Sequence, residues 1–192
     1  MARVRLVEET PTDAELNNMI EQIRRVEGIV PNHFKAELNF PELLKAMLNT
    51  TLVLWTRGEL ELKTLLMIGA VVSKENGCEY CVGAWGTWLT RAARLGRDEV
   101  YLLIRDWRSS NLPTERERKI LEFALKVNSR WRDITDRDVE DLKELGLSDK
   151  GVVQIVHAVN NFAAYNKFNI ALGVSPQHYD YEEIWSHAFH GK

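Results

Sequence analysis

The feature that most constrains this chain is a pair of apolar helical runs separated by a break that carries both of its cysteines. The first run ends at Asn76-Gly77, a dipeptide typical of a left-handed helix cap. In the second run, four residues at positions i, i+3, i+7 and i+10 fall on one face of the expected helix: Cys78, Cys81, Trp85 and Trp88. We therefore expect a helical hairpin whose second helix begins at a Cys-x-x-Cys pair.

The rest of the sequence also has the apolar periodicity of α-helices. We expect helical segments over residues 12–28, 33–38, 41–58, 60–76, 78–96, 98–107, 114–128, 138–146 and 149–172. Thr12-x-x-Glu15 and Thr114-x-x-Glu117 have the capping-box pattern, and Ser148 is expected to cap the last helix. A strand over 50–55, which is β-branched and apolar, is the alternative there. The sequence thus predicts an all-α protein built from packed helical hairpins.

Length and composition favour one globular domain. The chain has 192 residues, of which 45% are hydrophobic and 28% charged, as in ordinary globular proteins. We expect a single domain over 1–192 with its core at about 30–174. The C-terminal tail, 175–192, is expected either to lie at a subunit interface or to rest on the surface.

Charge and hydropathy exclude several classes of partner. A net charge of -3 provides no basic surface for nucleic acid or for an anionic membrane. No window reaches the roughly 18 apolar residues of a membrane-spanning helix, and the N-terminus lacks the apolar core of a secretory signal. Two cysteines are too few for a secreted disulfide scaffold. We expect a cytoplasmic protein that binds neither nucleic acid nor membrane.

The two thiols are the candidate catalytic groups. Thiolate is the reactive form of cysteine, and a helix N-terminus stabilises that anion. Because Cys78 is the nearer to the helix start, its pKa should be lowered more than that of Cys81. Such a pair supports attack by one thiolate on an electrophile and capture by the second thiol, which leaves a reducible disulfide.

The Cys-x-x-Cys pair has three other interpretations. A thioredoxin-like oxidoreductase needs a βαβ context, and both flanks here are helical. A zinc site needs two further ligands; there is no second Cys-x-x-Cys, and His157 is more readily explained as a packed histidine. We expect no metal and no cofactor. The remaining alternative is that the cysteines serve only as small buried side chains.

The segment from Leu60 to Cys81 resembles the core of the alkyl hydroperoxidase D-like, or carboxymuconolactone decarboxylase-like, superfamily. The whole chain is similar to the group of uncharacterised peroxidase-related proteins, over roughly residues 30 to 180. Further segments carry the resemblance: 112–126, 145–149 and 160–174. It implies an all-helical, alkyl hydroperoxidase D-like bundle and a homo-oligomer.

The resemblance also implies site residues. The family's peroxidase motif has a Glu twelve residues before the first cysteine and a His four residues after the second, which together relay a proton. By position Cys81 would attack the peroxide and Cys78 would resolve the product, but Leu66 occupies the Glu position and Trp85 the His position. Neither side chain acts as a base, and the apolar surroundings should raise the pKa of Cys81. Four other side chains are candidates to replace the missing Glu and His: Glu75, Glu79, Tyr80 and His157.

Two functions remain open at this point. The first is a thiol-dependent peroxidase or disulfide oxidoreductase, an antioxidant enzyme that reduces hydroperoxides through Cys78 and Cys81 and is recycled by an external dithiol. The second is a member that has lost the Glu and His relay and has a non-peroxidase small-molecule or binding role, such as a carboxymuconolactone decarboxylase-like activity. The intact cysteine pair favours the first function, whereas Leu66 and Trp85 favour the second.

Overall fold

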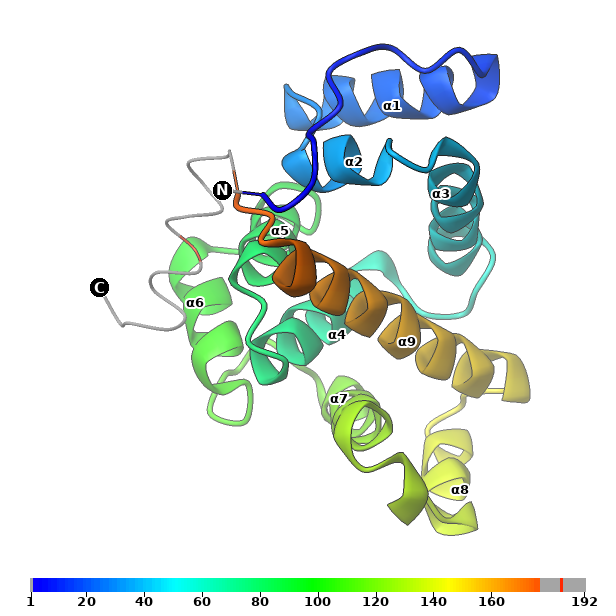
Figure 1. Cartoon of the computed structure of the whole chain (residues 1–192). Helices are drawn as coiled ribbons and strands as arrows, with labels where there is room; N and C mark the ends of the chain where they lie inside the picture. The colour runs from blue at the N-terminus through cyan, green and yellow to red at the C-terminus, as the bar shows by residue number, and fades with distance from the viewer. Residues whose placement is uncertain (1, 177–183, 185–192) are drawn as a thin grey trace.

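The structure, a computed structural model, describes residues 2–176 and Ile184 (Figure 1). The helices of this part, in chain order, are α1 (Ala14–Glu27), α2 (Asn32–Glu37), α3 (Pro41–Thr56), α4 (Leu62–Glu75), α5 (Glu79–Arg91), α6 (Arg97–Asp106), α7 (Glu115–Ser129), the short 3-10 helix η1 (Trp131–Asp133), α8 (Asp136–Glu144) and α9 (Asp149–Leu172). Strands do not occur among the described residues, so the all-α prediction is confirmed. The alternative strand over 50–55 is part of α3.

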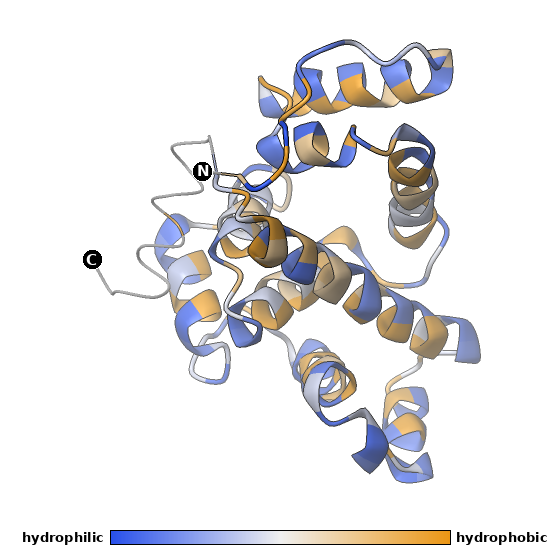
Figure 2. Cartoon of the chain, in the orientation of Figure 1, coloured by the Kyte–Doolittle hydropathy of each residue, from blue (hydrophilic) through white to orange (hydrophobic). Residues whose placement is uncertain are grey.

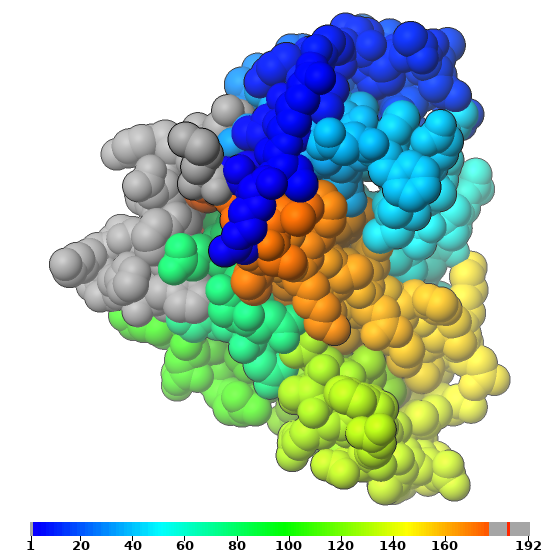
Figure 3. Space-filling model, in the orientation of Figure 1, coloured from blue at the N-terminus to red at the C-terminus, as the bar shows by residue number. Residues whose placement is uncertain are grey.

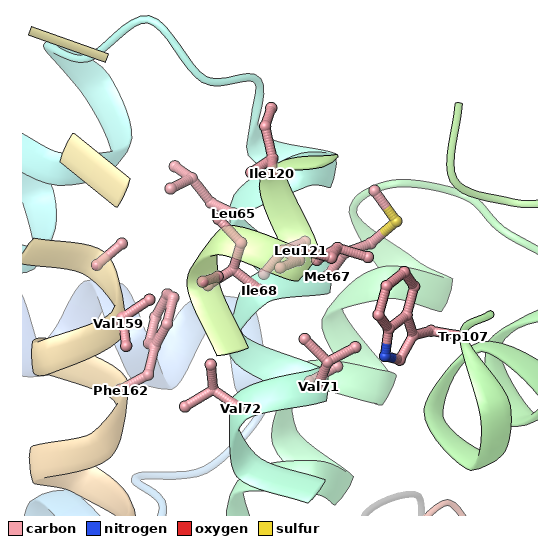
Figure 4. Close-up of a cluster of buried hydrophobic side chains, with 14 of the residues drawn as sticks. Leu65, Met67, Ile68, Val71, Val72, Trp107, Ile120, Leu121, Val159 and Phe162 are labelled. Atoms are coloured by element: carbon pink, nitrogen blue, oxygen red, sulfur yellow. The ribbon is translucent and has the colours of Figure 1, made fainter. Parts of the chain in front are cut away.

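The centre of the fold is α4. Every residue from Thr64 to Ser73 is buried, because α5, α6, α7 and α9 all pack against this one helix. The close-up in Figure 4 shows α4 side chains such as Ile68 between Leu121 of α7 and Phe162 of α9. Burying an aliphatic side chain of this size contributes about 1.5–3 kcal/mol. This interior explains why α4 is apolar on most sides, whereas the outer helices alternate apolar and polar stripes (Figure 2).

The N-terminal helices form a separate layer beside α9 (Figure 1). Leu16 and Ile20 of α1 pack with Val30 and Leu44 in a second, smaller apolar cluster. The segment before α1 runs across the C-terminal end of α9 (Figure 3), where the Arg3 backbone N–H donates to the Leu172 carbonyl over 2.8 Å. The N-terminal segment is therefore hydrogen-bonded to the C-terminal end of α9.

Local capping signals explain most helix boundaries. Thr114 and Glu117 form the predicted capping box, with N–H to oxygen distances of 3.2 and 2.8 Å, and Ser148 caps α9. The predicted box at Thr12 is wrong. Asp13 is the N-cap of α1 and accepts from the Leu16 N–H over 2.8 Å, since a carboxylate is well suited to the positive end of a helix.

The second helix of the hairpin is shorter than expected. It ends at Arg91 rather than near Gly96, because Arg94 adopts a left-handed conformation with φ 56° and turns the chain. Gly77, with φ 68°, makes the predicted left-handed turn between α4 and α5. Almost all of the tail at 175–192, and with it the expected subunit contact, lies outside the described residues. No helix of the described chain is both long and apolar enough to cross a membrane.

Candidate active site

The two cysteines meet at the start of α5. Cys78 is the N-cap residue, its backbone N–H donates to the Ser73 carbonyl over 2.9 Å, and Cys81 lies one turn further along. Both side chains are buried and both are free thiols, and their Sγ atoms lie 3.0 Å apart in hydrogen-bond contact. A disulfide needs sulfurs about 2.05 Å apart, so the pair is a reduced dithiol that a small approach would close.

The pKa values of the two thiols are shifted in opposite directions. The hydrogen bond from the Cys81 thiol lowers the pKa of Cys78, and burial only partly opposes this. Burial raises the pKa of Cys81 well above the usual value, and the neighbouring Cys78 sulfur raises it further. The dithiol therefore loses its first proton from the Cys78 side and holds the second at Cys81, as the sequence predicted for both residues.

Two carboxamides of α9 contact the dithiol. Asn169 donates from Nδ2 to Cys81 Sγ over 3.2 Å, and it is 3% exposed. Asn166, one turn earlier and fully buried, donates to the Ser73 hydroxyl over 2.9 Å and accepts from Asn76. Hydrogen bonds to the charged form favour it, so both carboxamides lower the thiol pKa values. Sequence reasoning missed this pair, although two asparagines three apart on an apolar helix were the available signal.

An imidazole reaches the site from α2. His33 is 5% exposed, and its Nδ1 lies 2.9 Å from the Asn169 Oδ1. Its Nε2 lies 3.2 Å from the Glu37 Oε2 on the same helix, but that oxygen has no hydrogen-bond partner among the described residues. A chain of two polar contacts therefore runs from Cys81 through Asn169 to His33. The sequence gives no local sign of it, since His33 and Asn169 are 136 positions apart.

Cys81 opens onto an apolar cavity of about 380 Å³. The cavity lies between α1, α3, α5 and α9, and its wall includes three tryptophans, Trp55, Trp85 and Trp88. These rings stack edge to face, with centroids 6.2 Å apart for Trp55 and Trp85 and 5.6 Å apart for Trp55 and Trp88. The predicted stripe of α5 thus points into one cavity, except that Cys78 does not contribute to its wall.

Polar groups in the cavity wall are few. Glu27, at the end of α1, accepts a hydrogen bond from the Trp88 indole N–H. The Tyr165 hydroxyl lies 3.0 Å from the Thr51 hydroxyl. Tyr80 is buried, and its hydroxyl accepts from the His33 backbone N–H over 3.3 Å. Burial raises the pKa of Tyr80 far above its ordinary value and that of Tyr165 to about 12, so neither phenol ionises near neutral pH.

The residues at the family's relay positions do not meet over the thiols. Leu66 is fully buried in the main core, and Trp85 packs on Phe162 with ring centroids 4.8 Å apart while it lines the cavity. Glu75 and Glu79 are exposed to solvent, as expected. His157 is also exposed on α9 and is absent from the cavity wall, so the hypothesis that it enters the site is not supported. Within the described chain, no three His, Cys, Asp or Glu side chains are grouped as a metal site.

Comparison with protein-family models finds one match. Residues 41–126 match the model of the carboxymuconolactone decarboxylase family, and this segment contains both cysteines. A comparison with curated proteins finds no match.

Solved structures share the fold over nearly the whole chain. An uncharacterized peroxidase-related protein from Silicibacter sp. TM1040 is 25% identical, with a TM-score of 0.83 over 96% of this chain and 95% of that one. A protein from Ralstonia eutropha JMP134, described as an alkylhydroperoxidase AhpD core and uncharacterized peroxidase-related protein, is 25% identical with a TM-score of 0.84 and the same coverage. The debrominase Bmp8 is 17% identical, with a TM-score of 0.77 over 91% of this chain and 92% of that one, which shows a shared fold alone. Residues 41–126 thus match the carboxymuconolactone decarboxylase family, and nearly the whole chain shares its fold with structures described as alkylhydroperoxidase AhpD-like, peroxidase-related proteins.

Proposed function

We propose that the protein is a thiol-dependent peroxidase or disulfide oxidoreductase that reduces hydroperoxides with Cys78 and Cys81. The observation that carries the proposal is the position of Cys81, whose side chain lines the cavity while the Cys78 sulfur lies 3.0 Å away. One sulfur can meet a substrate and the other is within reach of the oxidised product. The peroxidase-related names of the Silicibacter and Ralstonia proteins support the same class.

The first step of the proposed reaction is oxidation of Cys81. The Cys78 thiolate takes the Cys81 proton across the short sulfur–sulfur contact, and the Cys81 thiolate attacks the terminal oxygen of the hydroperoxide. The O–O bond breaks, Cys81 becomes a sulfenic acid, and the departing alkoxide takes a proton and leaves as the alcohol.

The second step closes the disulfide. The Cys78 sulfur attacks the Cys81 sulfur, the S–O bond breaks, and the hydroxide takes a proton and leaves as water. One hydroperoxide and two thiols thus yield one alcohol, one water and one disulfide. An external dithiol then reduces the disulfide by thiol–disulfide exchange and is itself oxidised.

A second candidate function is supported by the missing relay. Leu66 is buried in the core and Trp85 has no base function, so neither can move a proton as the family's Glu and His do. The alternative is therefore a non-peroxidase small-molecule or binding role, such as a carboxymuconolactone decarboxylase-like activity, in the same cavity. In that case the cysteines would stay reduced when a hydroperoxide is added.

Counting free thiols distinguishes the two candidates. We expect the reduced protein to lose two thiols per chain after one equivalent of an organic hydroperoxide, and to release one equivalent of alcohol. Cys78→Ser and Cys81→Ser should each prevent disulfide formation. Ala84→Ser is the matched control, since it adds a hydroxyl one turn from Cys81 in the same cavity wall and leaves both thiols. Two thiols that remain reduced through the reaction time would exclude the peroxidase proposal and favour the second candidate.

Assembly into a homo-oligomer is also proposed. Large apolar side chains are about half exposed or more on or beside α3, namely Phe40, Leu43, Leu52 and Val53. Such side chains are favourable contacts when a second subunit covers them. Light scattering after size exclusion should give a mass above that of one chain, and Leu43→Glu with Val53→Glu should reduce it. A parent protein that stays monomeric at high concentration would contradict this.

A further inference from the structure

The site lacks an ionisable group at either of the family's relay positions, yet an imidazole contacts it from another direction. His33 and His157 are the histidines in the described chain, and of these two only His33 lines the cavity that Cys81 lines. It does not contact the sulfur directly, because Asn169 lies between them. Any effect of His33 on the Cys81 thiol therefore passes through the Asn169 carboxamide.

The hydrogen-bond pattern places a proton on Nδ1 of His33. Asn169 donates from Nδ2 to Cys81, so its Oδ1 faces His33 and can only accept. The His33 Nδ1 must therefore carry a hydrogen and donate it to Asn169. This bond fixes which end of the Asn169 carboxamide faces the Cys81 sulfur.

We infer that His33 is a positioning residue which donates from Nδ1 to the Asn169 carbonyl and so holds the Asn169 amide group as a donor that stabilises the Cys81 thiolate. A proton on Nδ1 polarises the Asn169 carbonyl, and the polarised amide becomes a stronger donor to sulfur. Burial of His33 and Asn169 keeps water from screening this effect. The role rests on the proposed function only in that Cys81 is the attacking thiol.

The surroundings of His33 support an electrostatic rather than a packing role alone. Aromatic rings fix the imidazole, with centroid distances of 4.8 Å to Tyr165 and 5.3 Å to Phe168. The titratable groups that contact it or line the same cavity are Glu37 on its own helix, Tyr80 and Cys81 on α5, Tyr165 on α9 and Glu27 at the end of α1. Asn169 lowers the pKa of Cys81 against the larger effect of burial. A carboxamide does not carry protons, so the proton of Cys81 still leaves through Cys78.

The test measures ionisation of Cys81 without any peroxide. In a Cys78→Ser background, the rate of alkylation by iodoacetamide as a function of pH gives the apparent pKa of Cys81 alone. Adding His33→Leu, which removes the donor to Asn169, should raise that pKa by about one unit and slow alkylation about tenfold at neutral pH, whereas His33→Gln, which keeps a donor, should reverse most of both effects. At a pH above the Cys81 pKa values of the proteins with and without His33→Leu, their alkylation rates should converge, because these proteins differ only in the fraction of Cys81 that is thiolate. His157→Gln is the matched control, because His157 is an exposed histidine on α9. It should change neither the pKa of Cys81 nor the alkylation rate.

A double-mutant cycle tests the path through Asn169. Asn169→Leu, close to it in volume, should raise the pKa of Cys81, and His33→Leu should add nothing in that background. An unchanged pKa of Cys81 in His33→Leu would overturn the inference. An equal shift with and without Asn169 would overturn the path.

If His33→Leu does not fold, the imidazole N–H resonances of the Cys78→Ser protein supply the same answer. One of them should shift when Cys81 is also changed to serine, and this difference should vanish with Asn169→Leu. Resonances that do not respond to Cys81 would contradict the inference. Because no hydroperoxide is used, these results stand apart from the failure or success of the peroxidase proposal.

Discussion

The side chain of Cys81 lines the apolar cavity, whereas that of Cys78, with its sulfur 3.0 Å away, does not contribute to the described wall. The difference follows from helix geometry, since Cys78 is the N-cap of α5 and Cys81 lies one turn inside it on the face shared with Trp85 and Trp88. The two thiols therefore differ both in ionisation and in access. This asymmetry leads to separate predictions for each sulfur.

The sulfenic acid should form on Cys81. In Cys78→Ser the intermediate has no resolving thiol, so a sulfenic-acid-specific reagent should label one site per chain after organic hydroperoxide is added. Cys81→Ser should stay unlabelled at the same peroxide concentration, and turnover should fall at least about 100-fold in either variant. Mass spectrometry of the labelled peptide locates the site. Labelling at Cys78 in the Cys81→Ser protein at the parent rate would reverse the assignment.

The dithiol should titrate in two separated steps. Ultraviolet absorbance of the thiolate, corrected with a protein lacking both cysteines, should show one step below the ordinary thiol value of 9.0 and one well above it. The unfolded chain should show both protons leaving near that value. A single two-proton step in the folded protein would contradict the coupling.

The same shifts determine how each thiol affects stability with pH. The folded pKa of Cys78 is lowered, so its ionisation stabilises the folded state above the unfolded pKa, and this contribution is lost as the pH falls through the folded value. The folded pKa of Cys81 is raised, so its contribution is full below the unfolded pKa and is lost as the pH rises through the folded value. The free energy of unfolding by denaturant, measured from neutral to alkaline pH for the parent and each Cys→Ser variant, separates the contribution of Cys78 from that of Cys81.

Bulky apolar hydroperoxides should be better substrates than hydrogen peroxide. The wall of the 380 Å³ cavity is mostly aromatic and aliphatic, so an apolar substrate gains binding energy there and hydrogen peroxide does not. Ala84→Leu should fill part of this space and lower kcat/KM for an aromatic hydroperoxide about tenfold or more. Val153→Leu, at an exposed position of α9, is the control. An equal loss for hydrogen peroxide would show damage to the thiols instead.

Restoring the family's glutamate should destabilise the fold rather than create a relay. Leu66 is fully buried in the main core, so Leu66→Glu would bury an unpaired carboxylate at a cost of about 3–5 kcal/mol. Leu66→Met is the matched control and should cost less than about 1.5 kcal/mol. Urea unfolding measures both. A stable Leu66→Glu protein with faster thiol oxidation would mean that the position reaches the site after all.

The local parts of this structure could be predicted from sequence. The break at Asn76-Gly77, the start of α5 at the cysteines and the cap at Thr114 each depend on a few neighbouring residues. The helix spacing also correctly grouped Cys81, Trp85 and Trp88 on one face. The Thr12 cap was wrong because two adjacent residues, Thr12 and Asp13, can both cap, and side-chain geometry selects between them.

The polar half of the candidate site could not be predicted in this way. His33 and Asn169 are brought together only by the packing of α2 against the C-terminal part of α9, and no spacing rule spans 136 positions. Glu75 and Glu79 are near the cysteines in the sequence but face solvent, and His157 is on an exposed face of α9. The polar contacts of the candidate site thus come from helices far apart in the sequence.

The hydrogen bond from Trp88 to Glu27 ties the end of α1 to the helix that carries Cys81. The family segment, 41–126, contains the thiols and Trp88, but Glu27, His33 and Asn169 all lie outside it. Both sulfurs therefore lie within the matched segment. Glu27, His33 and Asn169, which line the same cavity as Cys81, come from parts of the chain on either side of it, so changes in α1 would alter the cavity wall and leave both cysteines in place.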